Sequence, residues 1–282
     1  MRWADMDLQG HVNNVVYLDY LQEARVDLLR SGGPDARPVT HPAQGGSGVI
    51  VVDHRVTYRA PLVFRFRPVM VEVWVTEVRA ASFALAYEVY QERDGERIVH
   101  LRATSTLAPF DFAADRPRRL TPEEKEGLTR YLEPGEKLGR LPWSGVPDST
   151  VGHYPVHVRF SDVDAYGHVN NVTYFEYFME ARIRHTARLW RDLPEGTPDP
   201  AFVVAQADVD YRTPMVFRAA SYDCFSAVAE VGTSSFRIDS EIREGGVVYA
   251  RSRVTLVFVD PATGRPAPPV PAYRDALLDA LG

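Results

Sequence analysis

The sequence predicts an α+β protein of two tandem domains, each with an antiparallel sheet and one long helix. The first observation is an internal repeat, because residues 5–25 and 162–182 align without a gap. The match continues downstream, where residues 58–62 resemble residues 211–215. The second observation is that each copy has one helical segment followed by about four strand-like segments. A sheet with one apolar face needs a cover, and the helix is the only element large enough to provide it.

The repeat also sets the expected domain boundaries. We expect an N-terminal domain over residues 1–132 and a C-terminal domain over residues 151–282. Between them, residues 133–150 are rich in proline, glycine and charged residues. That composition is typical of a linker that runs over the surface.

The long helix is expected directly after the Gly-His-Val-Asn-Asn segment of each copy. In the first copy, apolar residues at three- and four-residue spacing form a stripe. The stripe consists of Leu18, Leu21, Ala24 and Leu28. Either Asn13 or Asn14 supplies the N-cap, and the glycine pair 32–33 supplies the stop. The second copy repeats this pattern, with Asn170 or Asn171 as the cap.

The strands follow the helix in each copy. Runs of β-branched and aromatic residues predict strands over 49–58, 69–78, 82–92 and 98–107, and over 201–211, 222–231, 235–243 and 247–259. Hairpin turns are expected at 93–95 and 244–246, where the glycines stand. A short helix that begins with proline closes each half, over 122–132 and 271–281.

The start of the two copies differs. The second copy has a predicted strand over 154–160 before its motif, whereas the first has only residues 1–4. We therefore expect the translation start to lie upstream of Met1, which an intact-mass measurement on natively expressed protein would test.

Composition narrows the range of functions. The 282 residues carry a net charge of −6 and a pI of about 5.8, which disfavours a nucleic-acid-binding protein. No apolar run approaches the length of a membrane span, and the charged N-terminus is unlike a secretory signal. The single cysteine, Cys224, excludes an intrachain disulfide and fits a reducing, cytoplasmic location. We expect it to be a small core residue rather than a nucleophile.

The repeated motif is Asp-x-x-x-His-Val-Asn-Asn-x-x-Tyr, followed by Glu-Ala-Arg. It consists of Asp7, His11, Val12, Asn13, Asn14 and Tyr17, and again of Asp164, His168, Val169, Asn170, Asn171 and Tyr174. With this motif the chain resembles the hotdog-fold thioesterases of the 4-hydroxybenzoyl-CoA thioesterase class. That class includes bacterial long-chain acyl-CoA thioesterases and plant acyl-carrier-protein thioesterases.

The resemblance implies two tandem hotdog domains, each a sheet wrapped around a long central helix. It implies that the two domains pair within the chain, with active sites at the seam, and that whole chains can associate further. The catalytic aspartate of the family maps to Asp7 and Asp164, and the plant-type histidine to His11 and His168. The plant-type asparagine, two residues after the aspartate, is replaced by Gln9 and Tyr166. Tyr166 resembles the bacterial long-chain pattern and weakens a plant-type assignment.

The chemistry of these residue types fits thioester hydrolysis. A carboxylate can act as nucleophile or general base, and unpaired N–H groups at a helix start can bind an oxyanion. The first-copy candidates are Asp7 and His11 with the oxyanion and substrate residues Val12, Asn13, Asn14 and Tyr17. The second-copy candidates are Asp164 and His168 with Val169, Asn170, Asn171 and Tyr174. No metal and no organic cofactor is required.

Structural roles compete with these interpretations. The aspartates of the motif are also ordinary helix caps, and the histidines could only shape the loop. Tyr17 and Tyr174 favour packing. Asp5 and Asp162 are expected to be turn or surface acids rather than catalysts.

Other candidates are weaker. His153 and His157 lie in a predicted strand that separates them by about 13 Å, which does not suit a zinc site. Several arginines could meet CoA phosphates, although solvated surface charge accounts for them more simply. They are Arg59, Arg65, Arg67, Arg212 and Arg218.

The leading hypothesis is an acyl-CoA thioesterase of lipid metabolism with two sites per chain, acting on acyl-CoA or acyl-carrier-protein substrates. One alternative is a hotdog dehydratase or hydratase acting on 3-hydroxyacyl thioesters. Another is a protein that binds acyl thioesters without turnover. Neither nucleic acid nor a membrane is an expected partner.

Overall fold

The computed structural model of the chain describes residues 1–8, 10–30, 47–65, 67–135 and 142–281. It divides into two compact units. Unit 1 comprises Met1–Leu141 and the short segment Asp164–Gly167, and unit 2 comprises Pro142–Val163 and His168–Gly282. The division after Leu141 lies inside the range 133–150 that the sequence suggested as a linker.

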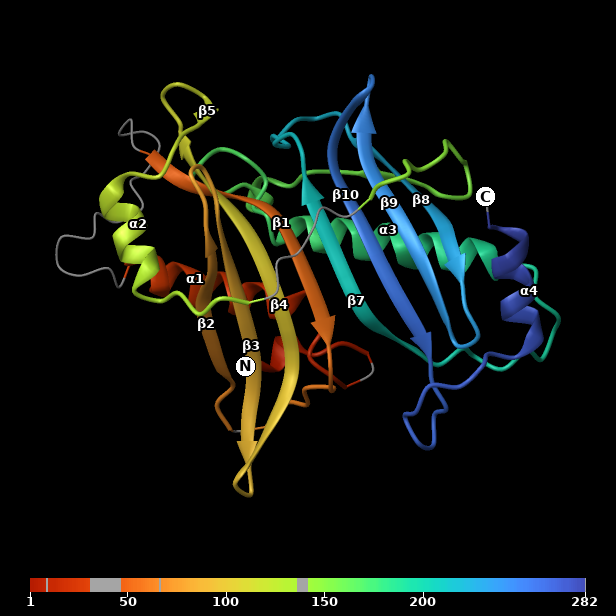
Figure 1. The fold of residues 1–282 in the computed structure, drawn as a ribbon. Coiled ribbons are helices and arrows are strands. Elements are labelled where there is room, and N and C mark those ends of the chain that lie inside the picture. Colours follow the sequence, from red (N-terminus) through yellow and green to blue (C-terminus); the bar gives the residue numbers. More distant parts are fainter. Residues whose placement is uncertain (9, 31–46, 66, 136–141, 282) are drawn as a thin grey trace. The chain divides into compact units, whose positions relative to one another are not determined.

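Unit 1 is an antiparallel sheet with one long helix across one face (Figure 1). Its elements are α1 (Val16–Arg30), β1 (Ser47–Tyr58), β2 (Met70–Val78), β3 (Phe83–Arg93), β4 (Glu96–Asp111), β5 (Arg116–Pro117) and α2 (Pro122–Thr129). The strand order is β2-β3-β4-β1, and β5 pairs with β4.

Unit 2 repeats this architecture and adds a strand at its start. Its elements are β6 (His153–Val156), α3 (Thr173–Leu189), β7 (Phe202–Tyr211), β8 (Tyr222–Val231), β9 (Ser235–Glu244), β10 (Val247–Phe258) and α4 (Pro271–Asp279). The antiparallel order is β7-β10-β9-β8-β6. The predicted α+β class with two tandem hotdog domains is confirmed.

The central helices form as predicted because their apolar faces are buried against the sheets. In α1, Leu18 and Leu21 are fully covered. The aromatic side chains of α3 are buried on several sides, which fits a helix wrapped by a sheet. These are Tyr174, Phe175, Tyr177 and Phe178. Each such side chain contributes roughly 1.5–3 kcal/mol of hydrophobic stabilisation. Cys224, on β8, is a fully buried core residue as expected.

The two predicted hairpin turns are confirmed by their backbone angles. Asp94 and Gly95 join β3 to β4 with φ of 54° and 83°, and Gly245 and Gly246 join β9 to β10 with φ of 55° and 83°. Two consecutive positive φ values define the turn that matches the right-handed twist of a hairpin. Aspartate and glycine are the residues that tolerate this conformation at low cost.

The predicted strand over 154–160 is wrong in its extent. Strand β6 ends at Val156, and Phe160–Asp162 forms a turn of 3-10 helix. The first copy has the same turn at Trp3–Asp5. The cause is local, because the aspartate at the end of each turn accepts a hydrogen bond from the backbone N–H of the arginine three residues before it. The closing helices α2 and α4 end earlier than predicted.

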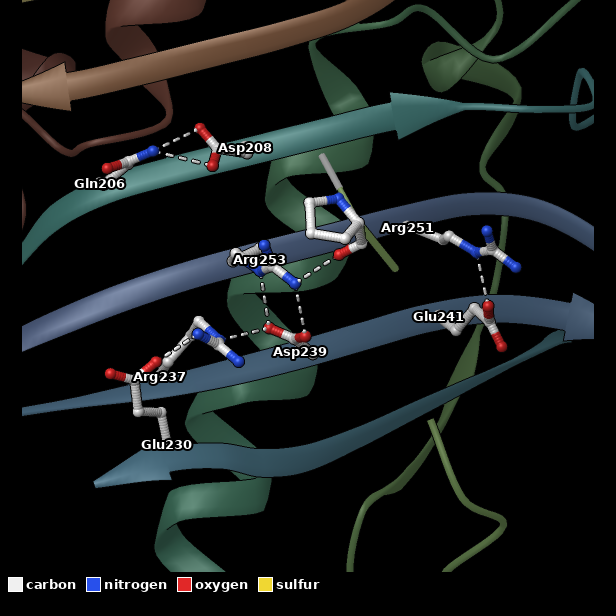
Figure 2. Close-up of polar contacts among 9 residues, drawn as sticks. Gln206, Asp208, Glu230, Arg237, Asp239, Glu241, Arg251 and Arg253 are labelled. Atoms are coloured by element: carbon white, nitrogen blue, oxygen red, sulfur yellow. Dashed lines mark hydrogen bonds and ion pairs between the residues drawn. The ribbon is translucent and has the colours of Figure 1, made fainter. Parts of the chain in front are cut away.

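The residues that enter unit 2 from the linker lie on the sheet face opposite α3. Arg253 donates to the carbonyl oxygen of Pro142 at 2.9 Å, and Arg243 donates to that of Val146 at 2.6 Å. Figure 2 shows Asp239 between two arginines on β9 and β10. The ion pairs of this face join Arg237 to Glu230, Arg237 and Arg253 to Asp239, and Arg243 and Arg251 to Glu241.

Every cation of this face that Figure 2 draws is therefore paired with a carboxylate. The cluster holds the linker against the sheet and is a structural feature rather than a candidate site. Within the described ranges, none of the helices has the length and apolar character needed to cross a membrane.

Candidate active site

Each motif loop turns sharply between the 3-10 turn and the central helix. Gly10 and Gly167 have φ of 76° and 78°, a left-handed conformation that favours glycine. Their N–H groups donate to the carbonyl oxygens of Asp7 and Asp164 at 3.1 and 3.0 Å. The sequence Asp-x-x-Gly-His therefore folds into the same backbone turn in both copies.

Backbone hydrogen bonds anchor each loop to the domain. The Asn13 and Asn170 N–H groups donate to the carbonyl oxygens of Asp5 and Asp162, both at 2.8 Å. One residue earlier, the Val12 N–H donates to the carbonyl oxygen of Leu62 at 2.8 Å. In the second copy, the Val169 N–H donates to the Met215 carbonyl oxygen at 2.9 Å. These four N–H groups are engaged in holding the loops, so they are poor candidates for an oxyanion hole.

The motif asparagines shape the approach to the helix. The side-chain oxygen of Asn13 accepts from the Val15 N–H at 3.2 Å, and that of Asn170 accepts from the Val172 N–H at 3.1 Å. The helices begin one residue later, at Val16 and Thr173, and the N-cap of α3 is Val172. The predicted asparagine N-cap is therefore wrong, and the first asparagine closes a turn ahead of the helix instead.

The second asparagine of each motif is held through its carbonyl oxygen. The Tyr58 hydroxyl donates to the Asn14 carbonyl oxygen at 2.7 Å, and the Tyr211 hydroxyl donates to that of Asn171 at 2.6 Å. The end of β1 or β7 thereby fixes the peptide that precedes each helix. Sequence reasoning missed Tyr58 and Tyr211, although both stand at matching places in the repeat.

Asp5 and Asp162 were expected to be turn or surface acids, and each does end a 3-10 turn, but neither lies at the surface because they are 1% and 4% exposed. Each accepts a hydrogen bond from a helix tyrosine, Tyr20 or Tyr177, at 2.6 Å. Each also accepts from the side chain of the preceding arginine at about 3 Å. Burial works against the charge of Asp5, but the hydrogen bonds from Tyr20 and Arg2 outweigh it and lower its pKa. Both aspartates therefore act as anchors of the loop.

The candidate catalytic carboxylates, Asp7 and Asp164, are half-buried and have different hydrogen-bond partners within the loop. Asp7 Oδ1 accepts from the His11 N–H at 3.3 Å, whereas Asp164 Oδ1 accepts from the Tyr166 N–H at 2.8 Å. In the first motif the turn brings the aspartate and the histidine together, because the Asp7 N–H also donates to the His11 carbonyl oxygen at 2.8 Å. His11 and His168 are both half-buried.

Tyr17 and Tyr174 are buried in the core, which supports a packing role. The Tyr174 hydroxyl accepts from the Met215 N–H at 2.9 Å. Burial raises the pKa of the Tyr17 hydroxyl well above its usual range, so it is neutral at physiological pH. Each ring meets the tyrosine at the end of β1 or β7 edge-on, at centroid distances of 5.7 and 5.2 Å. Tyr17 and Tyr174 therefore affect the site by holding the end of β1 or β7, the segment against which the motif loop packs.

The loop Asp164–Gly167 carries an aromatic contact that sequence reasoning did not identify. Within unit 1, to which this segment belongs, the Tyr166 ring stacks on Phe112 with centroids 4.4 Å apart and planes at 10°. A Cβ on Gly48 would lie 2.6 Å from the Phe112 ring, so glycine is needed there for Phe112 to approach the strand. Gln9, the counterpart of Tyr166, lies outside the described residues.

The remaining sequence candidates do not form a site. His153 Nε2 lies 2.8 Å from a carboxylate oxygen of Asp223, and His157 is exposed beyond the end of β6. Arg218 pairs with Glu244 and lies over the Tyr222 ring. Arg212 lies near Asp210, and the other three arginines are exposed.

Comparison with known proteins places the chain in a family. A model of the Thioesterase-like superfamily matches residues 1–128 and 158–281. YsmA, an uncharacterized protein of Bacillus subtilis (strain 168), is 30% identical over 125 residues, which are 44% of this chain and 82% of that protein. A solved structure assigned as an oleoyl thioesterase from Lactobacillus plantarum has a TM-score of 0.72 at 16% identity, covering 92% of this chain and 94% of that chain.

The 12:0-ACP thioesterase from Umbellularia californica has a TM-score of 0.67 at 17% identity, covering 92% of this chain and 95% of that chain. At these identities the structural likeness establishes the fold. The family model covers both copies of the repeat and both motif loops. The chain therefore belongs to the thioesterase-like superfamily and is a thioester hydrolase built from two tandem hotdog domains.

Proposed function

We propose that the protein is an acyl-CoA thioesterase with one catalytic centre in each motif loop, at Asp7 with His11 and at Asp164 with His168. The observation that carries the proposal is that both loops adopt one backbone geometry. The same glycine conformation and the same anchoring bonds recur in both copies. A loop with only a structural role needs one carboxylate, and the buried Asp5 and Asp162 already fill that role.

In the proposed mechanism, the carboxylate of Asp7 or Asp164 attacks the thioester carbonyl or removes a proton from the attacking water. The carbonyl oxygen takes up negative charge as the bond forms, and the C–S bond breaks when the carbonyl re-forms, so that the CoA thiolate leaves and takes up a proton. When the carboxylate itself attacks, this step leaves a mixed anhydride between the aspartate and the acyl group, which water then hydrolyses to the free acid and the free aspartate. The histidine of the loop orients the thioester or the water. The proposal keeps both roles of the carboxylate, nucleophile and general base, because either role suits a side chain held in a turn before a helix.

The oxyanion donors are proposed to lie at Asn14 and Asn171. The preceding N–H groups, at Val12 and Asn13 and their counterparts, hold the loop. Asn14 and Asn171 are the next motif residues and lie two residues before the helix starts, where the peptide dipoles place partial positive charge. Their carbonyl oxygens are fixed by Tyr58 and Tyr211, which also fixes the orientation of the neighbouring peptide groups. Tyr17 and Tyr174 are proposed to position the site rather than to bind substrate.

The substrate is proposed to be an acyl-CoA. A relative with the same fold is named for a 12:0-ACP substrate, so a carrier-protein thioester is the nearest variation on this proposal. The reaction is proposed to need no metal or organic cofactor and to take place in the cytoplasm. Pairing of the two domains within one chain, and association between chains, stay predictions.

A thiol-release assay tests the proposal. Acyl-CoAs of increasing chain length, an aromatic acyl-CoA and an acyl-carrier protein would be offered to the wild type. Asp7→Ala, Asp164→Ala and the double variant would be assayed beside it. Asp192→Ala removes an exposed carboxylate outside the loops and serves as the matched control.

The expected result is turnover by the wild type and the control, partial loss in each single variant, and loss in the double variant. A double variant that keeps wild-type turnover would sink the assignment of the two aspartates. A wild type that releases no thiol but hydrates an enoyl-CoA would support the dehydratase alternative. Saturable binding without turnover would support the binding-protein alternative.

A further inference from the structure

An aromatic stack holds the loop that carries Asp164. The rings of Tyr166 and Phe112 lie with centroids 4.4 Å apart and planes at 10°, and both residues are half-buried. The loop segment Asp164–Gly167 and Phe112 belong to the same compact unit. Stacked aromatic rings attract each other beyond the effect of burial alone. The stack therefore ties this loop to the end of β4, which Phe112 follows directly.

The position of Phe112 is itself fixed by its surroundings. The Asp111 carboxylate accepts hydrogen bonds from the Ala113 and Ala114 N–H groups, both at 3.0 Å, and so shapes the turn that presents Phe112. The Phe110 ring lies against Phe112 with centroids 5.2 Å apart. On β1, a Cβ at Gly48 would lie 2.6 Å from the Phe112 ring and 3.2 Å from the Tyr166 hydroxyl oxygen. Glycine at this position leaves the space that the stack occupies.

The other copy of the repeat lacks the three residues that make this contact. The residues at the matching places are Gln9 for Tyr166, Pro261 for Phe112 and Ala201 for Gly48. Neither glutamine nor proline supplies an aromatic face, and alanine carries the Cβ that the stack excludes. The three residues differ together between the copies, as expected if they form one contact.

Tyr166 also holds the candidate carboxylate of its loop. Its N–H donates to Asp164 Oδ1 at 2.8 Å, whereas Asp7 Oδ1 accepts from the His11 N–H at 3.3 Å. Burial raises the pKa of the Tyr166 hydroxyl, and the charge of Asp164 raises it further, so the hydroxyl is neutral. The stacked ring and the donating N–H belong to one residue. Holding the ring therefore also restricts the direction of the N–H.

We propose that Phe112 is a positioning residue that restrains Asp164 through Tyr166. The inference rests on the proposed catalytic role of Asp164. The stack keeps the Tyr166 N–H on the carboxylate, and a hydrogen bond to the charged form of a carboxylate lowers its basicity. Asp164 is then a weaker base or nucleophile than the same side chain without the bond. Because the first copy lacks the three residues, the restraint acts on one centre and makes the two centres unequal.

The first test observes the Tyr166 N–H directly. The full-length chain would be labelled with ¹⁵N-tyrosine, and the Tyr166 amide resonance would be assigned by its loss in Tyr166→Phe. Phe112→Leu should speed exchange of this amide with solvent at least about five-fold, because the hydrogen bond opens more often. Phe112→Tyr keeps an aromatic ring and should leave the exchange rate unchanged.

Phe225→Leu is the matched control for the loss of a phenylalanine ring. Phe225 is also half-buried, but it lies on β8 beside His153 and Arg243, outside both motif loops. Its substitution should leave exchange at the Tyr166 amide unchanged.

The second test measures thiol release in an Asp7→Asn background, where turnover depends on the Asp164 centre. Phe112→Leu should raise kcat about three-fold and leave KM unchanged, because the released carboxylate is more basic. Phe112→Tyr and Phe225→Leu should leave kcat unchanged. Loss of a merely structural contact would lower kcat, so the direction of the change separates the two roles.

Gly48→Ala probes the same contact from β1. The added Cβ would displace the Phe112 ring from Tyr166, so kcat in the Asp7→Asn background should again rise. In the presence of Phe112→Leu, Gly48→Ala should add no further rise, because two changes that act through one contact are not additive.

Unchanged exchange at the Tyr166 amide in Phe112→Leu would overturn the proposal. So would a kcat that stays the same or falls in that variant. If the wild type releases no thiol from any substrate, the proposed function fails, whereas the amide measurement needs no substrate and still decides whether Phe112 restrains the loop.

Discussion

The two motif loops have the same residues and the same backbone turn, yet their aspartates make different hydrogen bonds. Asp7 accepts from the N–H four residues ahead at 3.3 Å, and Asp164 from the N–H two residues ahead at 2.8 Å. The difference teaches that the anchors of the loop are separate from its candidate reactive group. The glycine, the first asparagine and the buried aspartate set the backbone of each loop. On this shared backbone, the half-buried carboxylate of Asp7 or Asp164 accepts a different hydrogen bond in each copy.

The units differ again at the edge of the sheet and on its outer face. Among the described residues, no strand pairs with the edge of β2 that faces the groove between α1 and β2, whereas β6 pairs with the matching edge of β8. On the outer face, unit 2 has the cross-strand pair Asp239 and Arg253, where unit 1 has Ala86 and Thr104. The two copies therefore share the motif loop, and they differ at this sheet edge and on this face.

The largest expected effect is on catalysis and concerns the two aspartates. Asn keeps a side-chain oxygen that can accept the loop hydrogen bond but cannot act as nucleophile or base. The double variant Asp7→Asn with Asp164→Asn should lose at least roughly 1000-fold in kcat/KM. Of the single variants, Asp7→Asn should lose more of the kcat/KM. The shorter hydrogen bond from the Tyr166 N–H holds the Asp164 carboxylate more firmly in its turn, so we expect Asp164 to contribute less to turnover than Asp7. Equal kcat/KM in the two single variants would show that the difference in hydrogen bonding has no effect on rate.

The next effect is on stability and compares the two anchors. Asp162→Ala and Asp5→Ala each leave a helix tyrosine hydroxyl without its buried acceptor, which costs about 2–3 kcal/mol. The partner arginines are mostly exposed, so their ion pairs add little. Urea unfolding measures the loss, and Asp192→Ala is the control. A loss below about 0.5 kcal/mol in both variants would contradict the anchoring role.

The pH dependence of stability can be tested in each unit separately, because each unit has a buried histidine with a lowered pKa. Burial lowers the pKa of His100 in β4 and of His185 in α3 below the usual value. Between the pKa of the histidine in the folded chain and about 6.5, the unfolded chain binds more protons than the folded chain. The free energy of unfolding is therefore highest above that range and falls as pH drops through it. His100→Tyr and His185→Leu insert the residue found in the other copy, Tyr249 or Leu28.

Each histidine variant should flatten the decline in Tm between pH 7 and pH 5, and the double variant should flatten it most. The measurement is a series of thermal melts at constant ionic strength. A decline that stays as steep in the double variant would assign the pH dependence to other groups.

The smallest expected effect is on thiol labelling and leaves activity unchanged. Burial raises the pKa of the Cys224 thiol to about 12, and β6 lies over it, so a thiol reagent should label native protein slowly. Val71→Cys, made in a Cys224→Val background, places a thiol at the matching but uncovered position. It should react at least about ten-fold faster. Comparable rates would mean that the groove is covered in solution.

Much of the fold could be predicted from local patterns. The repeat is visible in the sequence itself, and the central helices, the run of strands along the chain and the two hairpin turns follow from periodicity and turn chemistry, which act between residues close in sequence. Strand β8 was predicted to the residue, and α1 and α3 begin two residues after the Gly-His-Val-Asn-Asn segments, at Val16 and Thr173. The strand over 154–160 failed because the Asp162 carboxylate accepts a hydrogen bond from the Arg159 N–H, which competes with extended backbone, and strand propensity does not register such a bond.

The sequence by itself determined that the chain folds twice, which loop holds the candidate carboxylates, and which class of enzyme the motif indicates. Only the tertiary structure decided that Asp5 and Asp162 are buried anchors and that the N–H groups of Val12 and Asn13 are already engaged. The physical reason is distance along the chain. The acceptor for the Val12 N–H is Leu62, and the strand that covers Cys224 begins at His153, so neither is visible in a local pattern.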